Sequence, residues 1–192
     1  MLPEHTLHSE DIVTDEEILA AFRMAEKREL AFTWLVKRDQ KKIYWFIRRM
    51  VIDHDDANDL VQDTFIRAWN SLSGFRGESK IIYWLYRIAT NITLTYLDKK
   101  KRKGLLPIPE EADSLMEKLH SGNFINGNNI QMHLQEAILS LPERQRLVFQ
   151  LRYYDEIPYE EMSGMLDTSV GALKASYHHA VKKVEKYMLD HQ

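Results

Sequence analysis

The chain has 192 residues, of which 44% are hydrophobic and 29% are charged, a balance typical of a soluble globular protein. Its formal net charge of -3 excludes a bulk polycation, so any nucleic-acid binding has to come from local basic patches. The absence of cysteine excludes disulfides and thiolate catalysis and agrees with a reducing cytoplasm. Neither the N-terminus nor any apolar run resembles a signal peptide or a membrane span.

Helical spacing of apolar residues dominates the first half of the chain, and the low counts of 7 glycines and 5 prolines favour helices over turn-rich strands. Thr14 and Glu17 predict a capping box at the start of the first helix, after a frayed N-terminus. A longer helical pattern follows at residues 30–50. Asp56 is then expected to cap a third helix and Ser79 a fourth.

The character of the sequence changes after a basic run and Gly104, which suit the end of the fourth helix. Residues 104–130 contain prolines, acidic residues and a polar run rich in asparagine and glycine. They predict a flexible linker, with a short helix expected at residues 113–119.

Helical order returns at residue 131, and Pro142 is expected to occupy the first turn of a helix. A short helix at residues 159–166, a three-residue turn and a longer helix at residues 170–188 predict a helix-turn-helix. The chain is therefore expected to be all-α, with two small helical domains at residues 14–103 and 131–190.

The third expected helix, at residues 56–72, carries one face that its core does not explain. Asp59, Gln62, Asp63 and Ile66 share this face at spacings of three and four residues. A polar face with an apolar member favours a partner-binding surface, although a solvated polar face is the more frequent cause of such a pattern.

The fourth expected helix combines aromatic and polar residues on the side away from its predicted core: Tyr83, Tyr86, Arg87, Thr90 and Asn91. These residues adjoin a glycine-containing loop and a basic run. Aromatic rings interleaved with Arg and Asn suit stacking and hydrogen bonding to unpaired bases. The alternative is that the aromatic residues belong to the core and the loop is only a connector.

The last expected helix has small residues near its start and basic residues farther along. The outward positions are Gly171, Ala172, Lys174, Ala175, His178, His179, Lys182, Lys183 and Lys186. Small residues allow close approach to base edges, and Lys and His suit phosphate contacts. An ordinary solvated amphipathic helix remains the alternative.

The dipeptide His54-Asp55 resembles a metal-binding pair of helical phosphohydrolases, but such a site needs further ligands on neighbouring helices. The other histidines fall mostly in the expected termini, linker or last helix. A turn is the favoured interpretation. No phosphate loop or nucleophile motif is present, so no catalytic residue, metal or cofactor is predicted.

Several motifs together resemble the bacterial RNA polymerase sigma factors of the extracytoplasmic-function (ECF) group. They are DANDLVQDTF at 56–65, FR at 75–76, WLYRIATN at 84–91, LPERQR at 141–146, YEEM at 159–162 and SVGALK at 169–174. The resemblance covers nearly the whole chain except the first dozen residues and the linker. Its specificity comes from both blocks occurring together in this order.

The resemblance implies that the first domain docks on the clamp of the polymerase largest subunit and reads the minus-ten element. By motif match, Asp56, Asp59, Gln62, Asp63 and Ile66 would contact polymerase. The loop and the fourth helix would face the opened DNA strand through Phe75, Arg76, Ser79, Lys80, Tyr83, Arg87 and Asn91. A base turned out of the stack would be captured there.

The second domain, by the same resemblance, would grip the polymerase flap and place its last helix in the minus-thirty-five major groove. The DNA-facing residues would be Ser169, Gly171, Ala172, Lys174, Ala175, His178, His179 and Lys182. Such a protein is a cytoplasmic specificity factor and not an enzyme, without stable membrane insertion, and an anti-sigma protein is an expected partner.

Some positions depart from the family pattern: Ile81 stands where Phe is frequent, Tyr83 where a small residue is usual, and His178-His179 where Arg is common. Two other hypotheses stay open. A stand-alone helix-turn-helix regulator would bind duplex DNA without polymerase, and a helical metal-dependent hydrolase would hold metal at His54-Asp55.

Overall fold

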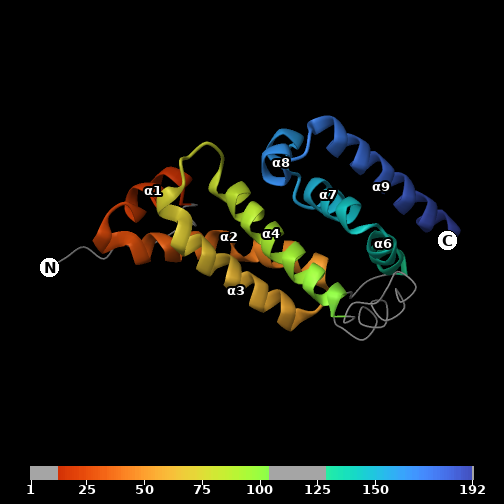
Figure 1. Cartoon of the computed structure of the whole chain (residues 1–192), viewed down its shortest axis with the longest axis horizontal. Helices are drawn as coiled ribbons and strands as arrows, with labels where there is room; N and C mark the ends of the chain where they lie inside the picture. The colour runs from red at the N-terminus through yellow and green to blue at the C-terminus, as the bar shows by residue number, and fades with distance from the viewer. Residues whose placement is uncertain (1–12, 104–128, 192) are drawn as a thin grey trace.

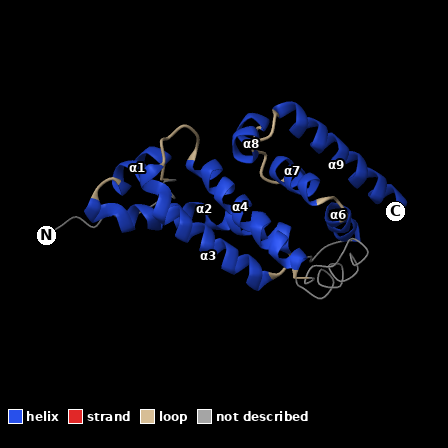
Figure 2. Cartoon of the chain, in the orientation of Figure 1, coloured by secondary structure: helices blue, strands red, loops and turns tan. Residues whose placement is uncertain are grey.

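The computed structural model describes residues 13–103 and 129–191, and within these ranges every regular element is a helix (Figures 1 and 2). The predicted all-α class is confirmed. The frayed N-terminus, the segment 104–128 and the short helix expected at 113–119 lie outside the described residues. The expected domain boundaries remain predictions.

The first half of the chain forms a bundle of helices in which α1 packs on the long α2, and α3 and α4 pack on α2 and on each other (Figure 1). The capping box at Thr14 is confirmed. Its hydroxyl accepts from the Glu17 backbone N–H at 3.2 Å, and the Glu17 carboxylate accepts from the Thr14 N–H at 2.8 Å. The elements are α1 (Asp15–Phe22), η1 (Ala25–Lys27), α2 (Arg28–Val51), α3 (His54–Ser71), η2 (Leu72–Gly74) and α4 (Ile81–Arg102).

The cap predicted for α3 is wrong by three positions. Asp53, not Asp56, is the N-cap, and its carboxylate accepts from the N–H groups of Asp55 and Asp56 at 3.0 and 3.1 Å. The chain turns sharply just before this cap because Ile52 has a φ of 65°. The helix can therefore begin one turn earlier than its sequence pattern indicates.

The cap predicted for α4 is also wrong, because Ser79 lies outside the helix and Lys80, at the N-cap, makes no capping bond through its side chain. Instead, an Asp15 carboxylate oxygen accepts from the Ile81 N–H at 2.8 Å. A residue of α1 thus satisfies a donor that the first turn of a helix leaves unpaired.

The second half contains α6 (Asn129–Leu139), α7 (Glu143–Tyr153), α8 (Tyr159–Leu166) and α9 (Val170–Asp190). The predicted helix-turn-helix is present: Asp167 adopts a left-handed φ of 48° between α8 and α9, and the Ser169 hydroxyl accepts from the Ala172 N–H at 3.3 Å. Pro142 is the N-cap of α7 and so precedes the first turn that it was expected to occupy.

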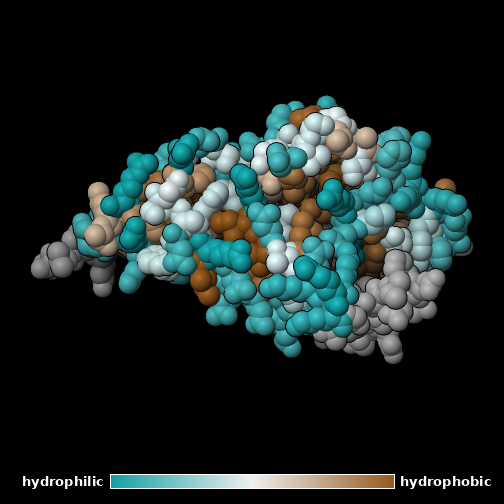
Figure 3. All heavy atoms as spheres, viewed as in Figure 1, coloured by the Kyte–Doolittle hydropathy of each residue, from teal (hydrophilic) through white to brown (hydrophobic). Residues whose placement is uncertain are grey.

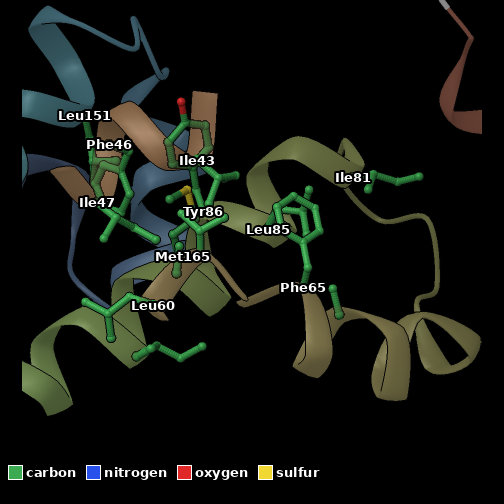
Figure 4. Close-up of a cluster of buried hydrophobic side chains, with 14 of the residues drawn as sticks. Ile43, Phe46, Ile47, Leu60, Phe65, Ile81, Leu85, Tyr86, Leu151 and Met165 are labelled. Atoms are coloured by element: carbon green, nitrogen blue, oxygen red, sulfur yellow. The ribbon is translucent and has the colours of Figure 1, made fainter. Parts of the chain in front are cut away.

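One apolar core runs through both halves of the described chain. Figure 4 shows Phe46 of α2 and Leu85 of α4 in the same cluster as Leu151 of α7 and Met165 of α8. A second, smaller cluster lies within the second half and consists of Ala137, Ile138, Leu141, Phe149, Ala180 and Val184. The two expected domains therefore pack together through buried side chains.

Among the helices that the structure describes, none combines the length and the hydropathy that crossing a bilayer requires.

Candidate protein-binding and nucleic-acid-binding surfaces

The predicted face of α3 is present in the structure. The buried side of this helix packs on the core, so the opposite side leaves Asp59, Gln62, Asp63 and Ile66 exposed. Ile66 is 53% exposed, so it adds apolar surface to this polar face. The structure thus brings these four residues together on one accessible surface.

A groove of about 620 Å³ runs beside this face, between α2 and α3. Phe32 and Val36 form its α2 side, and Ile66 and Trp69 lie on its α3 side. Trp69 is 36% exposed, although Phe22 and Phe32 contact it with 5.6 and 5.1 Å between ring centroids. Figure 3 shows hydrophobic residues reaching a largely hydrophilic surface in the first half of the molecule.

Sequence reasoning did not assign the α2 residues of this groove to a site. The only local signal was the spacing of four residues between Phe32 and Val36, which also fits an ordinary core stripe.

Asp56 differs from the other predicted polymerase-binding residues because its carboxylate is already paired. It accepts from the Lys100 ammonium of α4 at 2.5 Å, and both side chains are about one quarter exposed. Partial burial acts to lower the pKa of Lys100, but the hydrogen bond to Asp56 and the nearby Tyr96 outweigh it and raise that pKa. Asp56 therefore joins α3 to α4.

The loop before α4 holds its aromatic residue against the helix. Phe75 packs on Trp84 with 5.4 Å between ring centroids, while Arg76 and Lys80 are exposed and Ser79 is half-buried. Gly77 has a φ of 76°, a conformation that glycine adopts without strain. The loop therefore presents two cations beside a partly exposed ring.

Along α4, Tyr83, Arg87 and Asn91 follow one another at intervals of four residues, so they share one side of the helix. Tyr83 is half-buried, and Arg87 and Asn91 are exposed. The residues predicted to face the opened DNA strand, on the loop and on α4, are therefore exposed or half-buried.

The predicted outward placement of Tyr86 and Thr90 is wrong, because they are 3% and 2% exposed. Tyr86 packs edge-on against Phe46 at 5.2 Å, and its hydroxyl donates a hydrogen bond to Asp155. Burial is the main cause that raises its pKa. The second half of the chain covers this side of α4, which no pattern within α4 could reveal.

The outward side of α9 agrees with the sequence prediction. Ser169 caps the helix, and the other predicted residues on this side are exposed: Gly171, Ala172, Lys174, Ala175, His178, His179 and Lys182. The small residues and the basic residues of this side are therefore accessible together. The Lys174 ammonium lies 5.7 Å from the centre of the Tyr159 ring.

His54 is engaged by neighbouring side chains rather than by a metal-ligand set. Its Nδ1 lies 2.8 Å from the Tyr44 hydroxyl, and its Nε2 lies 3.0 Å from the Asn58 amide. Among the described residues, no three His, Cys, Asp or Glu side chains are grouped as metal ligands. The geometry offers no support for the hydrolase hypothesis.

Two stretches of the chain match known protein families. Residues 35–103 match Sigma-70 region 2, and residues 131–184 match Sigma-70, region 4. The first match contains α3, the loop and α4, and the second contains α7, α8 and most of α9.

Similar structures include the sigma factor RpoE of Bartonella quintana in complex with the anti-sigma factor NepR, with a TM-score of 0.65 and 21% identity over 82% of this chain and 96% of that one. CnrH in complex with the cytosolic domain of CnrY has a TM-score of 0.66 and 23% identity, over 93% of this chain and 98% of that one. These likenesses support the fold.

Among similar proteins, the ECF RNA polymerase sigma-E factor of Salmonella typhimurium is 30% identical over 184 residues, which cover 90% of this chain and 93% of that protein. The factor of the same name from Escherichia coli K12 has the same identity and coverage. That of Haemophilus influenzae is 28% identical over 186 residues, or 90% of this chain and 94% of that protein. The chain therefore belongs to the ECF sigma factors, and it is an alternative sigma factor that directs transcription initiation by RNA polymerase.

Proposed function

We propose that this sigma factor divides its work among three surfaces: the α3 face binds core polymerase, the loop with α4 reads the minus-ten element, and α9 reads the minus-thirty-five element. The observation that carries this proposal is the exposed α3 face, where acidic and apolar residues occur together beside a groove.

The α3 face has the composition of a protein-binding surface. Exposed Ile66 and Trp69 supply apolar area that water covers in the free protein. Asp59 and Gln62 line the same groove and supply a polar rim. This combination suits a helical partner that carries basic side chains, as expected for the clamp of the largest subunit.

The loop and α4 have the composition of a surface for unpaired bases. Arg76, Lys80 and Arg87 are cations for the phosphate backbone, and Tyr83 offers a ring for stacking. Asn91 adds an amide that can donate to and accept from a base edge. The larger Tyr83 ring should favour stacking over close approach of the backbone.

The α9 helix supports the minus-thirty-five assignment through its accessible N-terminal turns. Gly171, Ala172 and Ala175 let a helix approach the floor of the major groove, and Lys174 and Lys182 reach phosphates. His178 and His179 stand where Arg is common in the family, so phosphate contacts here should be weaker than those of an Arg fork.

Transcription from a mapped promoter with bacterial core polymerase tests the α3 assignment. We expect Asp59→Ala combined with Gln62→Ala to lower polymerase affinity and promoter-dependent transcript, because both side chains are exposed and lie on the proposed contact. Glu185→Ala, an exposed position on α9, is the matched control. Equal activity of both variants would contradict the assignment.

The minus-ten assignment calls for a different readout. Tyr83→Ala and Arg87→Ala should leave polymerase binding intact and reduce opening of the promoter. Promoter opening is measured by the permanganate reactivity of unpaired thymines. A loss of polymerase binding by these variants would contradict the assignment and would indicate that α4 contacts polymerase instead of DNA.

Two wider features of the proposal rest on relatives. RpoE of Bartonella quintana and CnrH are held by protein partners in their structures, and we propose that an anti-sigma protein likewise regulates this chain, competing with core polymerase.

The protein works in the cytoplasm as a non-catalytic factor. A stand-alone regulator would instead shift duplex DNA in gels without polymerase, which separates the two hypotheses.

A further inference from the structure

A series of polar contacts joins α1 and α2 to the first residue of α4. One Asp15 carboxylate oxygen accepts from the Ile81 N–H at 2.8 Å, and the other lies 2.8 Å from the Arg38 guanidinium. The same guanidinium donates to the Asp39 carboxylate at 2.8 to 3.2 Å and to the Val13 carbonyl at 2.9 Å. Three helices that are separated in the sequence therefore meet at the start of α4.

These contacts are more enclosed than an ordinary surface ion pair. The side chains of Asp39, Arg38 and Asp15 are 3%, 18% and 25% exposed. Burial acts to lower the pKa of Arg38, but the two carboxylates outweigh it and raise that pKa. Because the planar guanidinium binds Asp39 through two of its nitrogens, its orientation is fixed, and it in turn fixes the orientation of Asp15.

Asp15 lies at the N-termini of two helices at once. It belongs to the first turn of α1, and it accepts from a donor in the first turn of α4. The partial positive charge at each helix end stabilises a carboxylate in this position. Lys80, the N-cap residue of α4, makes no capping bond through its side chain. The start of α4 is therefore held from α1 and not from the loop that precedes it.

The loop at residues 75–80 is held at both of its ends. At one end, Phe75 packs on Trp84 with 5.4 Å between ring centroids. At the other end, Ile81 is fully buried and bonded to Asp15. Figure 1 shows α1 beside this loop. The residues between the two ends are exposed except for half-buried Ser79, so the ends determine the shape of the loop.

We propose that Asp15 and Arg38 are positioning residues that set the base preference of the minus-ten surface by fixing where α4 begins. The inference rests on the proposed minus-ten role of the loop and of Tyr83. Neither positioning residue needs to touch DNA. Arg38 orients Asp15, and Asp15 holds the Ile81 N–H, which lies two residues before Tyr83.

The expected effect is on discrimination between bases more than on total affinity. A site distinguishes similar ligands only when its groups are held to within about 0.5 Å. Without the bond to Asp15, the first turn of α4 has an unpaired donor and can fray, so the loop shifts relative to Tyr83. Different bases then fit about equally well, whereas contacts to phosphates, which carry no sequence information, remain.

The test measures base preference with the full-length protein bound to bacterial core polymerase. The probes are forked fragments of a mapped promoter, in which the non-template strand of the minus-ten element is unpaired. Each unpaired position carries each of the four bases in turn, and the measured quantity is the ratio of affinities for the best and the worst base. Partial unfolding lowers all affinities by the same factor, so this ratio reports the geometry of the loop and not the stability of the chain.

We expect the wild-type protein to prefer the best base roughly tenfold at the captured position, and Asp15→Ala to prefer it about twofold or less, since a wrong base usually costs at least fivefold at an intact site. Asp15→Asn should keep most of the preference, because its amide oxygen can still accept from the Ile81 N–H. Glu17→Ala is the matched control: it breaks the capping box of the same helix without removing the Ile81 contact, and should leave the ratio unchanged.

The role of Arg38 is tested by combining variants. Arg38→Gln should lower the ratio less than Asp15→Ala, because Asp15 stays in place as an acceptor but loses the guanidinium that orients it. The double variant should be no less selective than Asp15→Ala alone, because Arg38 acts through Asp15. Additive losses would show that Arg38 affects the loop by another route and would overturn its assigned role.

The proposal is overturned if Asp15→Ala keeps the full base preference, or if Glu17→Ala loses the preference to the same extent. A wild-type protein without base preference at any minus-ten position would overturn the minus-ten role of the loop, and this inference with it. The two failures are distinguishable, because in the first the wild-type protein is selective and in the second it is not.

Discussion

The α3 face and the α4 face differ in how the rest of the molecule treats them. Both were expected from amphipathic spacing to be exposed. On α3, all four residues of the predicted face are exposed: Asp59, Gln62, Asp63 and Ile66. On α4, Tyr86 and Thr90 are buried. The difference arises because α8 packs on α4 and nothing in the described chain packs on the outer side of α3.

The two helices therefore differ in how much of their surface the fold itself uses. On the proposed assignment, the outward side of α3 would contribute to binding and little to folding, whereas α4 packs against the second half along one side and would face DNA along another. Substitutions on the two helices should therefore separate stability from activity.

The largest effect should come from the helix that covers α4. Met162 of α8 is 0% exposed, and Met162→Ala removes buried volume that neighbouring helices cannot easily refill. We expect a loss of about 2–5 kcal/mol in the free energy of unfolding, measured by urea denaturation followed by circular dichroism. A loss below about 1 kcal/mol would show that α8 packs loosely and would weaken the contrast with α3.

A smaller effect should follow from removing the long-range cap of α4. Asp15→Ala deletes the acceptor for the Ile81 N–H and an ion pair of 2.8 Å with Arg38, so we expect a loss of about 1 kcal/mol, as for other N-caps. Glu16→Ala is the matched control, because Glu16 lies in the same first turn of α1 and is exposed. If both variants unfold at the same urea concentration, the cap has no energetic role.

The α3 face should show almost no effect on stability. Ile66→Ala removes apolar surface that is already 53% exposed, so the free energy of unfolding should change by less than about 0.5 kcal/mol. Affinity for core polymerase should still fall several-fold, measured by anisotropy of the labelled protein. A destabilised Ile66→Ala protein would mean that this face is part of the core after all.

The smallest effect should appear only in alkali, at the junction of α3 and α4. Burial, together with the nearby Asp56 carboxylate, raises the pKa of Tyr96 to about 12. A raised pKa gives stability that is complete below the unfolded value of 10 and is lost as pH rises toward 12. Tyr96→Phe should flatten this loss between about pH 10 and 12 in thermal melts, and an unchanged slope would contradict the assignment.

Features set by neighbours in the sequence could be predicted from it. The capping box at Thr14, the bounds of α8 and the exposed residues of α3 and α9 all follow from spacing within one helix. The motif resemblance to ECF sigma factors is confirmed by relatives that cover nearly the whole chain.

Features set by distant residues could not be predicted. The cap of α4 comes from Asp15, 66 positions away, and Tyr86 is buried by a half of the chain whose packing no local pattern encodes. Trp69 has the spacing of a core residue, yet the groove beside it leaves one side open. The roles assigned to individual residues of the three surfaces remain predictions.

The apolar core that both halves share has a consequence for how long the protein survives in the cell. Leu151, Ile157 and Met165 are buried in the core that the two halves share, and separation of the halves would expose part of this cluster to water. Proteases and chaperones act on such transiently exposed surface. We expect a molecule whose halves have separated to be degraded sooner than one whose shared core stays buried.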